Sequence, residues 1–524
     1  MWCGINTHGS MKHYIKNLSA ALALLAPMSL MAIEKDEDGR TYLISSANDL
    51  MEFAQLVNAG EAEAYARLTA DIDTRPLGDK FVPIGTAEYP YDGTFDGANH
   101  TITIALVSTH DCYGLFPYLC GGGHVTNLHV DGTLEVWHNN VGGLVGLLSA
   151  FAVVEKCISS VDITVKSGRY VGGLIGWSNG IYTPPYTRIE NCIYTGHIMG
   201  HTDFTCCGIV GWCDYGNEGH TVIKNCLVTG MVDVEIPTIG GFDHIIAGGE
   251  LSKLDKEWTG KNVLSYADVS NCYYVNACEP GELSGTTAIT MEQVRSGEAC
   301  YLMNVMEYQW GGAVRQTLFR QNIGEDEYPV FDEMHGVVAK IGPMGYGTWA
   351  GGDFNGWGSK ARVAAGVNAY AGTINGHTLQ LHPVEVMNGD NGNAYVIEGN
   401  PGYCSIMPTN EPVTNVENDL QGGNDVCPVQ YSTIYVLGVR DDVVGFYRVP
   451  NSGDALDSHI AYLRNPYLDA DVDVITMTYD DGTGIVDVES STSDVHSPIY
   501  DLSGRRVGKV TKGVHIIKGK KVLK

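Results

Sequence analysis

The sequence predicts a mainly β protein built from a stacked repeat solenoid, a β-sandwich and a small β tail. A five-residue phrase, Gly-Gly-Leu-Val/Ile-Gly, recurs along the first half of the chain, and such self-similarity is typical of repeat architectures. Hairpin signals replace the phrase in the second half. The 524 residues include 65 glycines, which suits a chain dense in turns because glycine adopts positive φ without steric cost.

The first residues indicate an export signal. Two lysines precede an apolar run that ends at Ala32 and is too short to span a bilayer as a helix. We place signal cleavage after Ala32, where the run gives way to charged residues. We therefore expect residues 1–32 to be a signal peptide, whether translation starts at Met1 or Met11, and the mature chain to lack a transmembrane span.

The sequence of residues 33–112 predicts a helix that caps the repeat stack, followed by a segment that leads into the repeats. A helix is expected over 46–58, because one apolar face recurs at helical spacing and Ser46 with Asp49 resembles a capping box. A strand over 66–72 and a lead-in segment follow. Since an open stack needs its end covered, we interpret the helix as the N-terminal cap.

The repeat unit is expected over residues 113–340. The phrase is complete at 142–146 and 172–176, with altered copies at 113–117 and 207–211, so its second glycine recurs every 29, 30 and 35 residues. A second phrase trails each copy, as in Glu190-Asn191-Cys192, and alternating apolar residues follow it. Two phrases at a fixed offset predict strand, turn and strand, stacked copy upon copy. A short helical stretch over 290–304 follows the last copy.

The second phrase places four cysteines at one repeat position: Cys157, Cys192, Cys226 and Cys272. Stacked strands lie ~4.8 Å apart, slightly beyond the ~3.8 Å that separates Cβ atoms in a disulfide. Export would favour oxidation, whereas this geometry favours a column of buried free thiols, and we predict the thiols.

These phrases resemble the GLUG repeat family of bacterial surface proteins. The resemblance covers residues 40 to 335 and includes the lead-in segment at 81–102, with its Gly-Thr-Phe-Asp-Gly core. It implies a secreted protein whose body is a right-handed parallel β-helix-like solenoid, often adhesive, with no shared catalytic residue.

Residues 341–484 predict a β-sandwich. Asn375-Gly376 lies between two alternating segments, which is the strongest short hairpin signal. A second hairpin is expected over 434–449, turning near 440–442. Dense turns and short strands favour a sandwich, which resembles the immunoglobulin-like accessory modules of such surface proteins.

A Ser/Thr/Asp-rich linker is expected over 485–498, followed by a tail whose charge is reversed. Residues 499–524 hold eight basic residues against Asp501 alone. The tail resembles the C-terminal sorting domain of type IX secretion cargo, which its blocks at 504–507, 513–516 and 519–522 match. That resemblance implies recognition by a secretion apparatus, and the alternative is a solvated basic tail.

Three motifs resemble catalytic or metal-binding sites, and each also has a purely structural interpretation. The pentapeptide at 176–180 matches G-x-S-x-G, but it lies inside a repeat rather than at a strand-to-helix turn. A zinc site is not predicted at Cys206, Cys207 and Cys213, because adjacent cysteines point to opposite faces of a strand. Asp71 and Asp73 could flank a glycosidic bond, although a solvated turn explains them as well. We therefore predict no catalytic residue, cofactor or metal.

Trp177 and Trp212 follow successive phrases and could form a glycan-stacking surface, although aromatic residues at a fixed repeat offset also serve packing. The net charge of −29 disfavours nucleic acid and anionic lipid as partners. We expect a non-enzymatic, adhesin-like or scaffold protein, secreted or held at the outer-membrane surface, that binds a glycan or another host or bacterial surface ligand. The alternative is a β-helix carbohydrate-active enzyme, either a polysaccharide lyase or a glycoside hydrolase.

Overall fold

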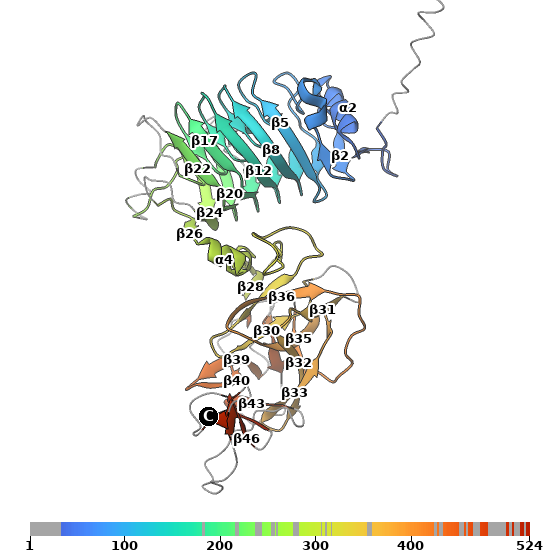
Figure 1. Ribbon diagram of the computed structural model, residues 1–524, viewed down its shortest axis with the longest axis vertical. Helices are drawn as coiled ribbons and strands as arrows, with labels where there is room; N and C mark the ends of the chain where they lie inside the picture. Colours follow the sequence, from blue (N-terminus) through green and yellow to red (C-terminus); the bar gives the residue numbers. More distant parts are fainter. Residues whose placement is uncertain are drawn as a thin grey trace, which may run out of the picture.

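The computed structural model shows a mainly β protein in which parallel sheets form the first half and a largely antiparallel sheet forms the second (Figure 1). The prediction of a mainly β chain is confirmed. The structure describes residues 33–523 apart from 181–183, 215–219, 236–243, 253–256, 258–259, 276–281, 305, 310–311, 316, 354–358, 424–426, 429–432, 450–454, 457–459, 465–471, 480–498, 502–505, 508–513 and 518–519. The predicted signal peptide with its cleavage site at Ala32, and the predicted linker, lie outside the described residues.

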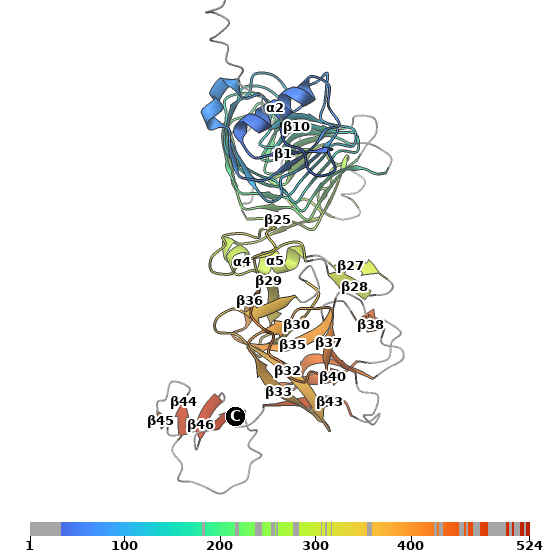
Figure 2. The same ribbon diagram turned by 90° about the vertical axis from the view of Figure 1, so that its right-hand side faces the viewer.

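The N-terminal helix forms as predicted. Helix α2 (Ala47–Asn58) begins after Ser46, whose side chain accepts a hydrogen bond from the backbone N–H of Asp49. Its apolar face, made by Leu50, Phe53, Ala54 and Val57, is fully buried. Figure 2 shows α2 lying across the end of the stacked sheets. A short 3-10 helix, η1 (Arg75–Lys80), follows the first strands.

The strand predicted over 66–72 is wrong in extent, because the chain makes two strands there. Strand β2 (Tyr65–Leu68) joins the eight-stranded sheet, whereas β3 (Ile72–Asp73) joins the ten-stranded sheet. The buried Ala66, Leu68 and Ile72 keep one alternation across the corner between the two sheets. The apolar pattern alone therefore hides the corner.

Two large parallel sheets carry most of the repeats. The eight-stranded sheet runs in the order β1 (Thr41–Ile44), β2, β4 (Thr94–Asp96), β7 (His124–Thr126), β11 (Val153–Glu155), β15 (Thr187–Glu190), β20 (Thr221–Lys224) and β24 (Ala267–Ser270). The ten-stranded sheet runs in the order β26 (Thr286–Ala288), β25 (Cys272–Tyr274), β21 (Leu227–Val228), β16 (Ile193–Tyr194), β12 (Ile158–Val165), β8 (His129–Val136), β5 (Thr101–Val107) and β3, with β17 (His197–His201) and β22 (Met231–Glu235) alongside.

Two smaller parallel sheets contain the Gly-Gly-Leu-Val/Ile-Gly phrase. One is ordered β23 (Ala247–Gly249), β19 (Val210–Asp214), β14 (Ile175–Asn179), β10 (Val145–Ser149) and β6 (Phe116–Leu119), and the other β18 (Cys206–Cys207), β13 (Val171–Gly172) and β9 (Val141–Gly142). Val145 pairs with Ile175, and Ile175 pairs with Val210. The pairing therefore advances by the same 30 and 35 residues as the phrase, so successive copies lie in register, with one buried apolar cluster between the sheets.

The second phrase forms the corner between the eight-stranded and ten-stranded sheets. Its central residue has φ between 50° and 57° in five successive copies: Asn127, Lys156, Asn191, Asn225 and Asn271. Asparagine tolerates this left-handed conformation better than most residues. The recurrence of asparagine in the phrase thus follows from the backbone of the turn.

The segment after the repeats covers part of the outer face of the ten-stranded sheet. Two helices, α4 (Met291–Arg295) and α5 (Glu298–Met303), replace the single helical stretch predicted over 290–304. The break falls at Gly297, which has a φ of 87°. Buried side chains of both helices pack against Ile158, Ile193, Leu227 and Tyr273 on the sheet. The hairpin β27 (Met306–Gln309) and β28 (Gly312–Arg315) follows.

The second half is built on one thirteen-stranded sheet. Its order is β32 (Asn368–Asn375), β33 (Thr378–Val384), β43 (Val474–Tyr479), β40 (Val443–Arg448), β39 (Ile434–Arg440), β42 (Tyr462–Arg464), β37 (Leu420–Gly422), β35 (Gly392–Glu398), β30 (Tyr346–Ala350), β29 (Val337–Ile341), β36 (Gly402–Pro408), β31 (Lys360–Val363) and β34 (Met387–Asn388). Strands β38 (Cys427–Pro428) and β41 (Ala455–Leu456) pair separately. The sheet begins with β29, a few residues before the boundary expected at 341.

Both predicted hairpins are confirmed. Asn375 pairs with Thr378 across the turn between β32 and β33, and Arg440 pairs with Val443 across the turn between β39 and β40. The sheet has two main apolar clusters, one around Trp349 and one around Phe446. The immunoglobulin-like topology stays a prediction.

The tail contains four short strands, β44 (Ile499–Asp501), β45 (Arg506–Val507), β46 (Val514–Ile517) and β47 (Lys520–Leu523). They pair antiparallel in the order β45, β44, β46, β47. Each of the three blocks expected in this tail overlaps one strand, β45, β46 or β47. Among the described residues, no helix is long and apolar enough to cross a membrane.

Candidate functional site

The ten-stranded sheet has the most strands of the parallel sheets in the repeat unit, and its outer face is toward the viewer in Figure 1. Because side chains alternate along a strand, every second residue of β5, β8 and β12 points away from the core. A hydrogen-bonded chain crosses this face: Thr101 Oγ1 lies 3.3 Å from His129 Nδ1, and His129 Nε2 lies 2.8 Å from Ser160 Oγ. Ser160 Oγ in turn lies 2.6 Å from Thr195 Oγ1. Burial lowers the pKa of His129, so at neutral pH its neutral ring links hydroxyls on both sides.

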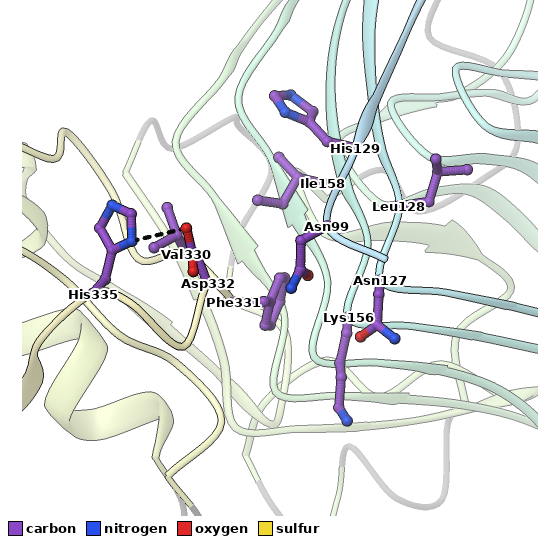
Figure 3. Close-up of a pocket in the computed structure, with 10 residues that line it drawn as sticks. All are labelled: Asn99, Asn127, Leu128, His129, Lys156, Ile158, Val330, Phe331, Asp332 and His335. Carbon is purple, nitrogen blue, oxygen red and sulfur yellow. Dashed lines mark ion pairs between the residues drawn. The ribbon is translucent and has the colours of Figure 1, made fainter. Parts of the chain in front are cut away.

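A cavity of about 150 Å³ lies where the segment 330–335 meets this face and the adjoining corner. Figure 3 shows Phe331 between the corner side chains and His335. His335 forms ion pairs with Asp332 and Asp326, at 3.4 and 3.5 Å. A cavity of this size holds one six-membered ring. Its walls combine apolar carbon with amide, ammonium and carboxylate groups: Asn99, Asn127, Leu128, His129, Lys156, Ile158, Val330, Phe331, Asp332 and His335.

Two glutamates lie side by side on the outer face of the eight-stranded sheet. Glu155 of β11 is the register partner of Glu190 of β15, which places their backbones ~4.8 Å apart. A hydrogen bond from His124, at 3.2 Å, lowers the pKa of Glu155. Burial raises the pKa of Glu190, although Arg188 lies 3.8 Å from its carboxylate and opposes the shift. Neighbouring carboxyl groups with opposed pKa shifts can divide the acid and base roles of a hydrolase.

The predicted stacking tryptophans pair with each other across β14 and β19. The Trp212 side chain is only 6% exposed and packs against Tyr170 and Phe204, with ring centroids 5.2 and 5.1 Å away. Trp177 is half-buried. A glycan-stacking surface at this position would therefore depend on Trp177, because Trp212 offers little surface.

The serine of the G-x-S-x-G match is a buried strand residue. Ser178 lies within β14, and its hydroxyl is 2.7 Å from the hydroxyl of Thr221. The motif of α/β hydrolases instead places its serine on an exposed turn before a helix. The geometry agrees with the interpretation that the match is coincidental.

The predicted cysteine column lies inside the repeat unit. Cys157, Cys192, Cys226 and Cys272 are fully buried free thiols. Each sulfur lies near the carbonyl two residues earlier and near a carbonyl of the preceding copy, as Cys192 does with Glu190 at 3.2 Å and Val154 at 3.6 Å. Burial raises the pKa of the Cys192 thiol, so the thiol stays protonated and unreactive in the folded chain.

The two aspartates near the N-terminal end make local contacts. Asp71 accepts a hydrogen bond from the backbone N–H of Thr101 at 2.9 Å, and its pKa is lowered by that bond. Asp73 pairs with Arg75 at 2.8 Å. Within the described residues, no group of three or more His, Cys, Asp or Glu side chains is placed to hold a metal ion.

Sequence reasoning missed Trp137, Glu155 with Glu190, and the cavity. The glutamates occupy one position of the second phrase, so the repeat alignment could have paired them. Trp137 directly follows the strand β8 and is 51% exposed, but no repeat position marks it. The cavity depends on the fold of the segment 330–335, which carries no sequence signal for a ligand.

Comparisons with known proteins give one distant structural likeness. No family model matches this chain, and no curated protein matches it. Among solved structures, the chain is similar to a crystal structure from Bacteroides ovatus that is named as a proposed immunoglobulin A1 protease. The two share 18% sequence identity with a TM-score of 0.40, over 57% of this chain and 93% of the other. A likeness of this size carries no argument about activity.

Proposed function

We propose that this chain is a secreted or cell-surface protein of adhesin or scaffold type, whose repeat unit binds a glycan or another surface ligand without enzymatic turnover. The observation that carries this proposal is the in-register stacking of the repeats. Successive copies pair as parallel strands up to β26, so equivalent positions on the outer face recur at a fixed ~4.8 Å spacing. Extended ligands such as polysaccharides can engage a face of this kind at several points.

The stacking also supports a right-handed parallel β-helix of GLUG type as the architecture of this body. The chain visits the eight-stranded sheet, the ten-stranded sheet and the phrase-bearing sheets in turn, copy after copy. Each visit is a short strand, and the left-handed corner residues turn the chain between the first two. The thirteen-stranded unit would then act as an immunoglobulin-like spacer between this body and the tail.

The tail supports export to the cell surface through a type IX apparatus. It combines reversed charge with four short antiparallel strands, and a solvated basic tail has no reason to alternate as strands. We expect the repeat unit to bind its ligand outside the cell, after the tail has directed the chain through the secretion apparatus.

Cell adhesion tests this function directly. The mature chain, residues 33–524, would be labelled and incubated with bacterial and epithelial cells, with a chain lacking 113–275 as the matched control. We expect saturable binding of the full chain only. Equal binding of the control, or none by either chain, would contradict the proposal.

A carbohydrate-active enzyme is the second candidate, favoured by the opposed pKa shifts of Glu155 and Glu190. Retaining glycosidases hold two carboxyl groups ~5 Å apart, a separation that neighbouring strands allow. Incubation with plant, bacterial and host polysaccharides, followed by a reducing-end assay, separates the two functions. Release of reducing ends that Glu190→Gln abolishes would establish the enzyme.

A further inference from the structure

Trp137 is an exposed aromatic side chain held in a fixed position. It lies just beyond β8 on the outer face of the ten-stranded sheet, and 51% of its surface is exposed. Its backbone N–H donates a 2.8 Å hydrogen bond to Ser108 Oγ, and its carbonyl accepts a 3.0 Å hydrogen bond from Ser167 Oγ. Ser108 and Ser167 lie just after β5 and β12, the strands that flank β8 on either side. Trp137 is therefore anchored from both neighbouring turns of the stack.

The indole ring is oriented as well as anchored. Its Nε1–H donates a 2.5 Å hydrogen bond to the carboxylate of Glu135. A ring held in one orientation loses little conformational freedom when a ligand arrives, so less of the contact energy is offset by ordering the side chain. A large aromatic face beside a carboxylate suits a sugar ring, whose C–H groups stack on the indole while its hydroxyls donate hydrogen bonds.

The surface beside Trp137 continues along the stacking direction. Glu135 is the register partner of Val107 on one side and Thr164 on the other, and Thr164 is followed by Met199 and Asp233. These five positions span about 19 Å at ~4.8 Å per strand. The row offers apolar contacts at Val107 and Met199 and polar groups between and beyond them, which matches the mixed chemistry of a polysaccharide.

The negative charge of this face favours neutral polysaccharides over anionic ones. Besides Glu135 and Asp233, the same outer face presents Asp131 and Asp162, and the whole chain has a net charge of −29. An anionic glycan would meet carboxylates here, whereas a neutral glycan can donate its hydroxyls to them.

We propose that Trp137 and the row from Val107 to Asp233 bind a neutral polysaccharide chain laid along the repeat stack, with one sugar ring on the Trp137 indole. This inference rests on the proposed function and specifies its ligand class and binding site. It replaces Trp177 and Trp212 with Trp137 as the stacking residue.

The test uses the mature chain and defined probes. A glycan array is followed by titration calorimetry with neutral hexasaccharides of glucose, mannose and galactose, and with oligogalacturonate as the anionic contrast. We expect at least one neutral hexasaccharide to bind and oligogalacturonate not to bind. Trp137→Ala should lose about tenfold or more in affinity, while Trp137→Tyr retains most of it. Tyr65→Ala, which removes a 49% exposed aromatic from the other large sheet, should bind as the unaltered chain does.

The possible outcomes distinguish failure of the Trp137 site from failure of the proposed adhesive function. Unchanged affinity in Trp137→Ala, preference for oligogalacturonate, or failure of every neutral probe would overturn the site. If the chain still adheres to cells in those cases, the adhesive function stands and only the glycan assignment fails. Loss of circular dichroism in Trp137→Ala would shift the comparison to Trp137→Tyr and to Glu135→Gln, which should weaken binding while leaving the backbone anchors intact.

Discussion

The side-chain amide of Asn225 donates a 2.7 Å hydrogen bond to Oδ1 of Asn191, its counterpart in the preceding repeat. Asn271 donates in the same way to Asn225, at 2.8 Å. All three residues have left-handed backbone conformations. The asparagine side chains therefore tolerate the strained turn and also link the corners of three successive copies by hydrogen bonds. The ladder stops at Lys156, which occupies the same corner without an amide.

Lys156→Asn is therefore expected to stabilise the repeat unit. Asparagine adopts the left-handed conformation at lower cost than lysine, and its amide can extend the ladder, for a combined gain of about 1 kcal/mol. Calorimetry should show a higher melting temperature for the repeat unit. Lys166→Asn, which removes the same charge at an exposed residue just after β12, is the control and should change little. A lower melting temperature for Lys156→Asn than for the control would refute this account of the corner.

Gly173→Val should disrupt the repeat stack. A Cβ at Gly173 would lie 2.2 Å from the carbonyl oxygen of Gly208 and 2.5 Å from the Tyr194 ring, and backbone cannot move aside as a flexible side chain can. We expect the calorimetric transition of the repeat unit to disappear while that of the thirteen-stranded unit remains. Gly122→Val, whose Cβ would meet only Asp92 Oδ1 at 3.4 Å, should leave both transitions. Joint loss of both transitions in Gly173→Val would show that the two units do not fold independently.

The cysteine column should consist of free thiols in the exported protein. Denaturing alkylation without a reducing agent is expected to label Cys192 and Cys226, and mass spectrometry reads the labels. Under native conditions the same residues should stay unlabelled, because both are fully buried and burial keeps the Cys192 thiol protonated. Finding Cys192 joined to Cys226 would contradict the geometric argument.

Glu155→Gln should destabilise the fold at pH 7, whereas Glu190→Gln should not. The pKa of Glu155 is lowered from 4.5, so its ionised form stabilises the fold at neutral pH, and that contribution is lost as pH falls through the lowered value. Glu155→Gln should therefore cost about 1 kcal/mol at pH 7 and little in acid. The pKa of Glu190 is raised, so Glu190→Gln should be neutral or stabilising at pH 7. Urea unfolding at both pH values checks this, and a loss for Glu155→Gln that persists in acid would assign its role to packing.

Repetition made much of the fold predictable from the sequence. Every copy folds in the same way, so one phrase predicts the same local structure each time it recurs. In Glu190-Asn191-Cys192, the three residues mark a strand end, a left-handed corner and a buried position. The Asn375-Gly376 turn and the Ser46 cap were predictable without repetition, because each depends only on residues that are close in sequence.

Features that depend on distant neighbours were not predictable. Gly297, with a φ of 87°, divides the helical stretch into α4 and α5, and both helices pack on the surface of the ten-stranded sheet, which the local sequence does not show. The exposure of Trp137 and the burial of Trp212 depend on what adjacent copies place beside them. The candidate site therefore emerged from packing rather than from motif spacing.

The most direct test of the central claim, that this is a surface protein exported through its tail, is protease shaving of intact cells that express the full chain or a chain ending at residue 498. We expect the full chain to be digested at the surface. The truncated chain should be protected, folded and retained in the periplasm. A truncated chain that reaches the surface in normal amount would contradict the account and reduce the tail to a solvated basic segment.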